Sequence, residues 1–473
     1  MDGPTFSPRL RDMNLDTKDQ RVCSECVDDE FLRTKIEEDG HDAACFYCAR
    51  DGRTFSVDQM ADLVRSALPE LFDRIDLNPP DDAGGWHSKG QPVADVLNGA
   101  GIGYLATEDI LRVLAERHRM EQGEIGSEAN PFDDKARYVR KDSVDAWDFE
   151  GDWFDFERSL KTEARYFNRR AEATLASIFD GIDGHRTIGG RPIVAEAGPG
   201  TELAVLYRAR VFHSEKRPDQ EIGPPPASFA AAGRMNAAGI AVFYGATDPS
   251  VALAEVRPPV GSKVLIGCFE VIRRLSLLDL EALEAIVSER GSIFDADYIR
   301  RLKQAEFLRG LSKRFSKPVM PDDQPRDYLR TQAVADFLAT MDDPPLDGII
   351  YPSVQIGYLR PRRILAPGAD KRNVVLFHKS ARVQCLDIPE GSEISVSDDS
   401  FWPPLFGYSD DYAGSLIDAP EAKYAVTEKV PKAAPPADSD DAHLKFSSLE
   451  VHFVNGVTLS TRSSQVLRHR EQP

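Results

Sequence analysis

Residues 242–257 read VFYGATDPSVALAEVR, and this stretch predicts a strand followed directly by a short helix. Residues 240–244 form an apolar run bounded by glycines, as expected of a buried strand. Thr247 or Asp248 can cap the helix that follows, and Pro249 stands where a first helical residue needs no amide hydrogen. This strand followed by a helix therefore indicates a domain that contains both strands and helices.

One carboxylate interrupts the apolar face of this short helix. Val251 and Ala252 precede Glu255 by four and three positions, so all three side chains share one helix face. A half-buried carboxylate needs a partner or a chemical task, because an unpaired one is driven to take up a proton. The simplest interpretation is an ion pair with Arg234, Arg257 or another cation. A catalytic carboxylate is the alternative.

Composition restricts the class of protein before any motif is considered. The 473 residues are 41% hydrophobic and 29% charged, which suits two or three domains with apolar cores. The formal net charge of -20 and a pI near 5.0 argue against broad attraction to nucleic acid or anionic membranes. The sequence has neither an apolar stretch of membrane-spanning length nor the apolar core of a secretory signal, so we expect a cytoplasmic location.

Four of the six cysteines form the motifs CSEC and CFYC, in a C-x2-C-x18-C-x2-C pattern. Cys23, Cys26, Cys45 and Cys48 can thereby bring four thiolates to one tetrahedral zinc ion, and four protein ligands indicate a structural site. Two disulfides and a redox pair remain alternatives. His41 is surplus to the four ligands, and we expect it to lie at the surface.

The first part of the chain is predicted to be mainly helical, as a bundle. Ser56 and Gln59 have the spacing of a capping box, and Thr107 is expected to cap another helix. The expected helices cover 56–72, 91–99, 107–118 and a longer segment at 156–179. We expect this N-terminal domain to occupy residues 1–182, with the zinc knuckles at 23–48.

A glycine-rich polar stretch at 181–192 marks the expected domain boundary. Beyond it, strands and helices mix without regular alternation, which predicts an α+β domain over 195–400. The expected strands lie in 201–212, 240–244, 263–272, 347–353 and 373–377, and the expected helices at 293–315 and 326–341. Residues 401–473 are expected to form an extension, with a Pro/Ala-rich linker at 429–443 and a hairpin at 446–467.

Five short motifs in this second domain occur in a recognisable order. They are YR at 207–208, GRMNAAG at 233–239, Tyr244 after an apolar strand, A-x-x-E ending at Glu255, and YPS at 351–353. In this order the stretch from about Leu203 to Phe377 resembles the RES domain family, named for its arginine, glutamate and serine. Met235 departs from the tryptophan usual in the family. The N-terminal cysteines and residues 164–179 resemble the HEPN-like domain fused to longer RES proteins.

The resemblance implies an ADP-ribosyltransferase-like fold that binds NAD and breaks its nicotinamide–ribose bond, as in toxins of toxin–antitoxin pairs. Glu255 would stabilise the positive charge that develops on the ribose. Arg208, with Arg234 as a second candidate, would bind the pyrophosphate. Tyr244 would stack on nicotinamide or cover the ribose, and Ser353 would hydrogen-bond nicotinamide or brace the pocket wall. The implied partners are a cognate antitoxin or a protein acceptor.

Two other functions remain open at this stage. HEPN domains can be ribonucleases with an R-x4-6-H motif, and Arg112 with His118 has that spacing, although the acidic composition disfavours nucleic acid. A non-catalytic module that only binds a nucleotide is the second alternative. Hydrolysis, phosphorolysis and transfer to a protein share one leaving-group chemistry, so the sequence does not choose among them.

Overall fold

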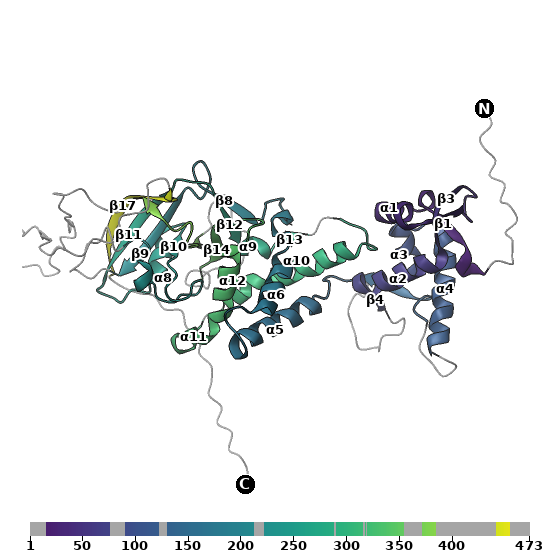
Figure 1. Cartoon of the computed structure of the whole chain (residues 1–473), viewed down its shortest axis with the longest axis horizontal. Helices are drawn as coiled ribbons and strands as arrows, with labels where there is room; N and C mark the ends of the chain where they lie inside the picture. The colour runs from purple at the N-terminus through teal and green to yellow at the C-terminus, as the bar shows by residue number, and fades with distance from the viewer. Residues whose placement is uncertain are drawn as a thin grey trace, which may run out of the picture. The chain divides into compact units, whose positions relative to one another are not determined.

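The computed structural model describes residues 16–75, 90–122, 130–211, 222–287, 290–315, 317, 319–353, 371–384 and 441–454. The chain divides into two compact units (Figure 1). Unit 1 consists of Met1–Asp152 with Val287–Leu308, and unit 2 consists of Trp153–Ile286 with Arg309–Pro473. Helices α5 (Trp147–Thr162) and α10 (Ala296–Phe315) contribute residues to both. The division lies upstream of the stretch 181–192, which folds within unit 2.

Unit 1 combines helices with two small antiparallel sheets, in the orders β1-β3-β2 and β4-β6-β5. Its described helices are α1 (Glu30–Asp39), α2 (Val57–Leu71), α3 (Val93–Gly99) and α4 (Tyr104–Gln122), with 3-10 turns η1 (Thr17–Asp19) and η2 (Ser24–Cys26). Its strands are β1 (Arg21–Cys23), β2 (His41–Ala44), β3 (Asp51–Ser56), β4 (Phe72–Ile75), β5 (Gln91–Pro92) and β6 (Arg137–Arg140). The sequence analysis did not predict these strands, because they are short and mostly polar. Unit 1 is therefore not an all-helical bundle.

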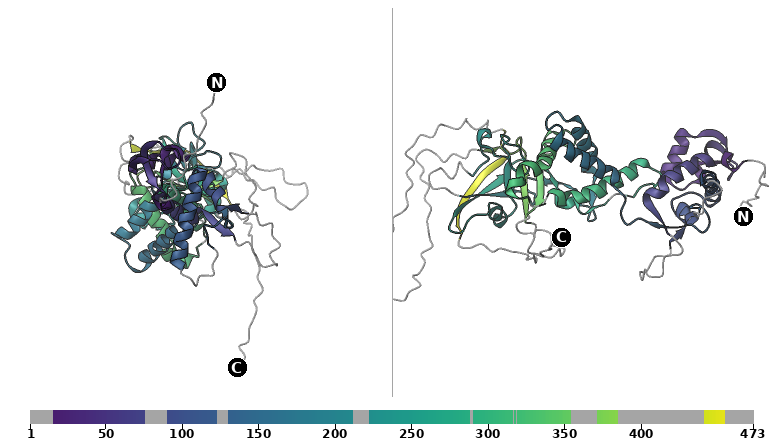
Figure 2. Two further views of the ribbon diagram at one scale, coloured as in Figure 1. Left: turned by 90° about the vertical axis from the view of Figure 1, so that its right-hand side faces the viewer. Right: turned by 90° about the horizontal axis from the view of Figure 1, so that it is seen from below.

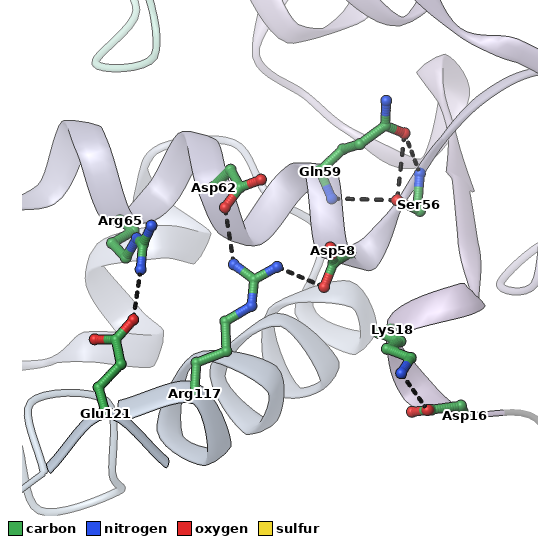
Figure 3. A network of polar contacts seen from close by, with 9 residues as sticks. All are labelled: Asp16, Lys18, Ser56, Asp58, Gln59, Asp62, Arg65, Arg117 and Glu121. Carbon is green, nitrogen blue, oxygen red and sulfur yellow. Dashed lines mark hydrogen bonds and ion pairs between the residues drawn. The ribbon is translucent and has the colours of Figure 1, made fainter. Parts of the chain in front are cut away.

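Helix α2 is the centre of the unit 1 core. Met60, Ala61 and Val64 are fully buried in a cluster that also contains Ile110 of α4. On the polar side Arg117 of α4 pairs with Asp58 and Asp62 of α2, and Arg65 pairs with Glu121 (Figure 3). The two helices are thus joined by apolar packing on one side and ion pairs on the other.

The capping box at the start of α2 is confirmed. The Ser56 hydroxyl accepts from the Gln59 amide, and the Gln59 side chain accepts from the Ser56 amide (Figure 3). We expect Ser56→Ala to destabilise this first turn by about 1 kcal/mol, which raises hydrogen exchange of the Gln59 amide about fivefold. Ser66→Ala, which removes a hydroxyl from the middle of the same helix, should leave that rate unchanged. Equal exchange in both variants would contradict the role of the cap.

Two of the predicted helix boundaries are wrong. Helix α4 begins at Tyr104, so Thr107 lies inside it, fully buried, and donates to the Asn98 side chain instead of capping. The long helix predicted at 156–179 is two helices, α5 and α6 (Arg169–Phe179). Phe167 between them has φ 56° and is fully exposed. A new helix begins after Asn168, because the Asn168 side chain caps α6 by accepting from the Ala171 amide.

Unit 2 is built on a nine-stranded mixed sheet in the order β16-β17-β11-β9-β10-β15-β14-β12-β8. The strands are β8 (Val194–Ala197), β9 (Val205–Val211), β10 (Phe243–Ala246), β11 (Lys263–Val271), β12 (Leu275–Asp279), β14 (Gly348–Pro352), β15 (Arg372–Leu376), β16 (Val383–Gln384) and β17 (Leu444–Phe453). The helices and turns are α6, η3 (Ile182–Gly184), η4 (Ala227–Phe229), α8 (Pro249–Glu255), α9 (Leu280–Leu283), η5 (Pro321–Asp323), α11 (Gln324–Asp327) and α12 (Leu329–Thr340). A two-stranded sheet pairs β7 (Arg186–Thr187) with β13 (Ile286–Val287). The predicted α+β character is confirmed.

One apolar cluster of unit 2 lies on one face of this sheet. Phe243, Leu265, Phe269, Ile350 and Val374 are fully buried there and come from four different strands. The rings of Phe243 and Phe269 meet edge to face at 4.9 Å. Their burial fixes which side chains of each strand face the opposite side.

The C-terminal part of the chain adds a strand to this sheet. β17, the yellow strand in Figure 2, pairs antiparallel with β11 along the whole length of β11. This strand is the first arm of the predicted hairpin at 446–467. The second arm and most of the predicted linker at 429–443 lie outside the described residues. No helix in the described ranges is long and apolar enough to cross a membrane.

Candidate active site

The nine-stranded sheet is weakly joined between β9 and β10. These strands share a single residue pair, Tyr207 with Ala246, whereas β9 pairs with β11 over seven positions. Gly245 permits the close approach at this point, because a Cβ there would lie 3.2 Å from the backbone oxygen of Tyr207 on β9. Beyond the pair the two strands diverge. A pocket of about 480 Å³ is lined by residues from both strands.

The pocket walls come from β9, β10, α8, the end of α10, α11, β14 and β15, all within unit 2. Its lining includes Tyr207, Arg208, Arg234, Tyr244, Glu255, Arg257, Tyr328, Tyr351 and Asn373. Three arginines, four tyrosines and one carboxylate therefore face one space whose volume is typical of small-molecule sites. Four of the five residues predicted for catalysis or substrate binding are among them.

Arg208 reaches across the divergence of the two strands. Its guanidinium donates to the backbone oxygen of Tyr244 at 3.1 Å, a carbonyl that the weak β9–β10 pairing leaves open. Its Nε is buried and has no hydrogen-bond partner among the described residues. Burial, with the nearby charge of Arg210, lowers the pKa of Arg208 to about 10. The side chain is still cationic at neutral pH, and within the described residues no carboxylate pairs with it.

Glu255 is the last residue of α8 and projects into the pocket. Asp248 caps this helix by accepting from the Ser250 amide, as one of the two predicted caps. Val251 and Ala252 are buried, whereas the Glu255 side chain is exposed, so the carboxylate is not half-buried as expected. Among the described residues it forms no ion pair, and the simple interpretation of a salt bridge to Arg234 or Arg257 is wrong for this part of the chain.

Two neutral donors hold the Glu255 carboxylate instead. The Ser353 hydroxyl and the Asn373 side-chain amide both donate to its Oε1 at 2.8 Å. Ser353 follows β14 directly and is 5% exposed. The predicted serine and glutamate are therefore brought into contact although 98 residues separate them.

Tyr244 is held by the loop that precedes β10. Its hydroxyl accepts from the Met235 amide and donates to the Asn236 side chain, both at 2.9 Å. A Cβ on Gly233 would lie 2.7 Å from this hydroxyl, so the glycine permits the contact. Burial raises the pKa of Tyr244 to about 12. The hydroxyl is thus committed to the loop, and the ring is the part that lines the pocket.

The same loop explains why β10 begins later than predicted. Asn236 is 3% exposed and donates to three backbone oxygens, including that of Ile240. The expected strand at 240–244 therefore starts only at Phe243, because these carbonyls are satisfied by the loop and not by a neighbouring strand.

Arg234 lines the pocket but has structural partners. Its guanidinium donates to the backbone oxygens of Phe315 and Lys317 at the end of α10, and it stacks over Tyr328 at 5.2 Å. A cation at the carboxyl end of a helix is favoured by the helix dipole. Arg234 is therefore less available than Arg208 to an anionic ligand.

Sequence reasoning missed Asn373 and Tyr351. Both lie on the pocket face of the sheet and are opposite one another in the β14–β15 register. The available signal was a polar residue at the start of an otherwise apolar strand, in RNVVLF at 372–377. For Tyr351 the signal was the motif YPS itself, from which only the serine was selected.

The four cysteines of unit 1 cluster as predicted. Cys23 ends β1, Cys26 lies in η2, and Cys45 and Cys48 lie in the turn between β2 and β3. The four sulfurs are within 4.8 Å of one another, with 3.5 Å between Cys23 and Cys48 and 3.7 Å between Cys26 and Cys45. A tetrahedral metal with bonds of 2.3 Å spaces its sulfurs by about 3.8 Å. The cysteines are unbonded to one another and fit a metal ion, and His41 is exposed.

Arg112 and His118 are not brought together. They lie six positions apart on α4, and 3.6 residues per turn place them about 120° apart around the helix. Arg112 pairs with Asp109 and donates to Thr17. The geometry gives no support to a ribonuclease site at this pair.

Comparison with known proteins gives one family. A model of the RES domain matches residues 205–397, from the first residue of β9 onward, and this range includes all five residues predicted for catalysis or substrate binding. The chain therefore carries a RES domain over this stretch. No curated protein and no solved structure matches the chain. The match does not reach unit 1, so the resemblance of that unit to HEPN-like domains stays a prediction.

Proposed function

We propose that unit 2 binds NAD and cleaves its nicotinamide–ribose bond, as a toxin-like RES enzyme with an ADP-ribosyltransferase-like fold. The observation that carries the proposal is one pocket that holds both a cation and a carboxylate. The cation is Arg208, which no carboxylate pairs with in the part of the chain that the structure describes, and the carboxylate is Glu255, which neutral donors orient. NAD offers a pyrophosphate to the first and a ribose that becomes cationic to the second. The tyrosine rings lining the pocket suit the flat bases of a dinucleotide.

The chemistry proceeds by loss of nicotinamide. The bond between the ribose C1′ and the ring nitrogen breaks, and its electron pair leaves with neutral nicotinamide. The ribose becomes oxocarbenium-like, and the negative charge of Glu255 stabilises it only as this charge develops. An oxygen of water, phosphate or a protein side chain then bonds to C1′, and with water the released proton passes to solvent.

Incubation of the purified chain with NAD, with and without phosphate, tests this proposal. Chromatography of the products separates hydrolysis to ADP-ribose from phosphorolysis to ADP-ribose phosphate. Unchanged NAD in every condition would reject an NAD-degrading enzyme and favour a nucleotide-binding module or transfer to a protein. A cognate antitoxin or protein acceptor belongs to the proposal as a partner.

Arg208→Ala is expected to weaken NAD binding at least about tenfold. A hydrogen bond to a charged group contributes about 1.5–3 kcal/mol, and here the pyrophosphate would supply the partner that the Arg208 Nε lacks among the described residues. Thermal-shift titration with NAD gives the affinity and the stability of the free protein together. Arg210→Ala on the same strand is the matched control and should retain wild-type affinity. Equal affinities of the two variants would contradict the role of Arg208.

We further propose that the four cysteines hold a structural zinc ion. Thiolates are soft ligands that select zinc among the common cytosolic metals, and four of them leave no position for a substrate. The ion would brace the amino-terminal end of unit 1, and it takes no part in NAD chemistry.

A further inference from the structure

Asn373 is the most deeply buried polar residue of the pocket wall. It is the second residue of β15, between β10 and β14, opposite Ala246 on one side and Tyr351 on the other. Its side chain is 2% exposed and points to the pocket face, where its amide donates to Glu255 Oε1 at 2.8 Å. A buried amide is costly unless its hydrogen bonds are satisfied, and Asn373 is followed in β15 by two valines and a leucine.

Asn373 and Ser353 converge on the same carboxylate oxygen. Both donate to Oε1 of Glu255, and no described residue is bound to Oε2. The carboxylate therefore has one oxygen fixed to the sheet and one oxygen left for a ligand. The fixed oxygen is held from two neighbouring strands, so its position is set by the sheet and not by the short helix that carries Glu255.

We propose that Asn373 is a positioning residue for catalysis, which holds Oε1 of Glu255 on the sheet and leaves Oε2 directed to the ribose. The inference rests on the proposed function and adds to it a residue and a division of labour between the two oxygens. Ser353 shares this task, and its hydroxyl is thereby occupied by Glu255.

Neutral donors suit this task better than a cation would. Glu255 ends a helix of seven residues and is exposed, so without anchors its long side chain would sample many rotamers. Hydrogen bonds to a carboxylate favour its ionised form. An arginine partner would do the same but would also neutralise the negative charge. Asn373 and Ser353 orient the carboxylate and leave that charge available to the developing oxocarbenium ion.

Asn373→Asp gives the sharpest test, because aspartate can donate to Glu255 only while its own carboxyl group holds a proton. Two carboxylates in contact share a proton, which raises the apparent pKa of the pair above the usual range. The kcat of this variant should approach wild type at low pH and fall at least tenfold as the pH rises and the second proton is lost. The other charged groups lining the pocket are Arg208, Arg234 and Arg257. Tyr244 and Tyr351, whose pKa values burial raises, stay neutral.

Asn373→Leu and Thr247→Val are the comparisons. Leucine keeps the volume of Asn373 but cannot donate, so kcat should fall about tenfold at every pH with little change in KM. Thr247 bonds the backbone of Arg372 at the β10–β15 junction without touching Glu255. Its valine variant should show the wild-type pH profile. The inference is overturned if Asn373→Asp and Asn373→Leu have the same pH profile.

A stability measurement separates this inference from the proposed function. The melting temperature of Asn373→Asp, relative to Asn373→Leu, should fall by about 2–4 °C between pH 5 and pH 8, because the ionised pair repels. In a Glu255→Gln background the fall should disappear, since glutamine can donate to aspartate. A fall that persists in the Glu255→Gln background would contradict the contact between residues 373 and 255. The fall in melting temperature could depend on Glu255 as expected while the wild-type protein leaves NAD intact. This result would confirm the contact between Asn373 and Glu255 but reject the proposed function and, with it, the catalytic role of Asn373.

Discussion

Glu255→Gln is expected to lower the kcat for NAD cleavage by about a thousandfold while leaving the melting temperature close to that of wild type. Glutamine keeps the shape of the side chain, and its oxygen can still accept from Ser353 and Asn373. Only the negative charge is lost. Removal of one preorganised electrostatic contact to a transition state commonly costs 100- to 1,000-fold in kcat, and a full charge belongs at the upper end.

The measurement is the rate of nicotinamide release under saturating NAD, with thermal unfolding followed in parallel. KM should change little, because the charge acts on the transition state more than on the bound substrate. Glu270→Gln is the matched control. It removes a carboxylate from β11 that pairs with Lys445 outside the pocket, and it should retain full activity. A folded Glu255→Gln variant with wild-type kcat would reject the mechanism.

The sheet of unit 2 was predictable where local sequence determines it. β9, β11, β14 and β15 are apolar runs bounded by turn residues, and each was predicted within a few residues. The start of α8 was predicted because Asp248 and Pro249 are local signals that act within one turn. Such elements depend on neighbours in sequence, which a single sequence displays.

The features that create the site depend instead on long-range pairing. The single bridge between β9 and β10 arises from the strand order, which the apolar pattern does not encode. The contact of Asn373 with Glu255 spans 118 residues. The apolar helix face around Glu255 indicated that this carboxylate needed a partner. The sequence alone does not show whether that partner is a cation or a neutral hydrogen-bond donor. The partner was therefore predicted as an arginine and observed as an amide and a hydroxyl.

Unit 1 shows the same limit for domain boundaries. Residues 287–308 lie more than 130 positions after the rest of this unit, yet Ile293 and Phe294 are buried in its core. Ser292 donates to Asp29, which itself caps α1. No composition change in the sequence marks this return of the chain. Contiguous limits at 182 and 195 followed from the glycine-rich stretch between them, the strongest local signal of a break.

Replacement of Cys23 and Cys26 by serine is expected to abolish metal binding and unfold unit 1, while unit 2 remains folded. Val22 and Val27 flank these cysteines and are buried in the unit 1 core, so the proposed metal would fix β1 and η2 against that core. Tyr47, between the other two ligands, donates to the buried carboxylate of Asp109 on α4. Loss of the proposed ion would therefore release β1 and the contact of Tyr47 with α4.

The free energy of folding lost with the metal is expected to exceed what the apolar core of unit 1 can offset. A structural zinc contributes on the order of 10 kcal/mol at neutral pH, which is comparable to the entire stability of a domain. Elemental analysis should find about one zinc per wild-type chain and none in the double variant. Hydrogen exchange should show lost protection in α2 and retained protection in β11. Cys268→Ser on β11 is the control and should keep the metal. If the wild-type protein contains no metal and its thiols are oxidised, the zinc site is rejected and the four cysteines form disulfides instead.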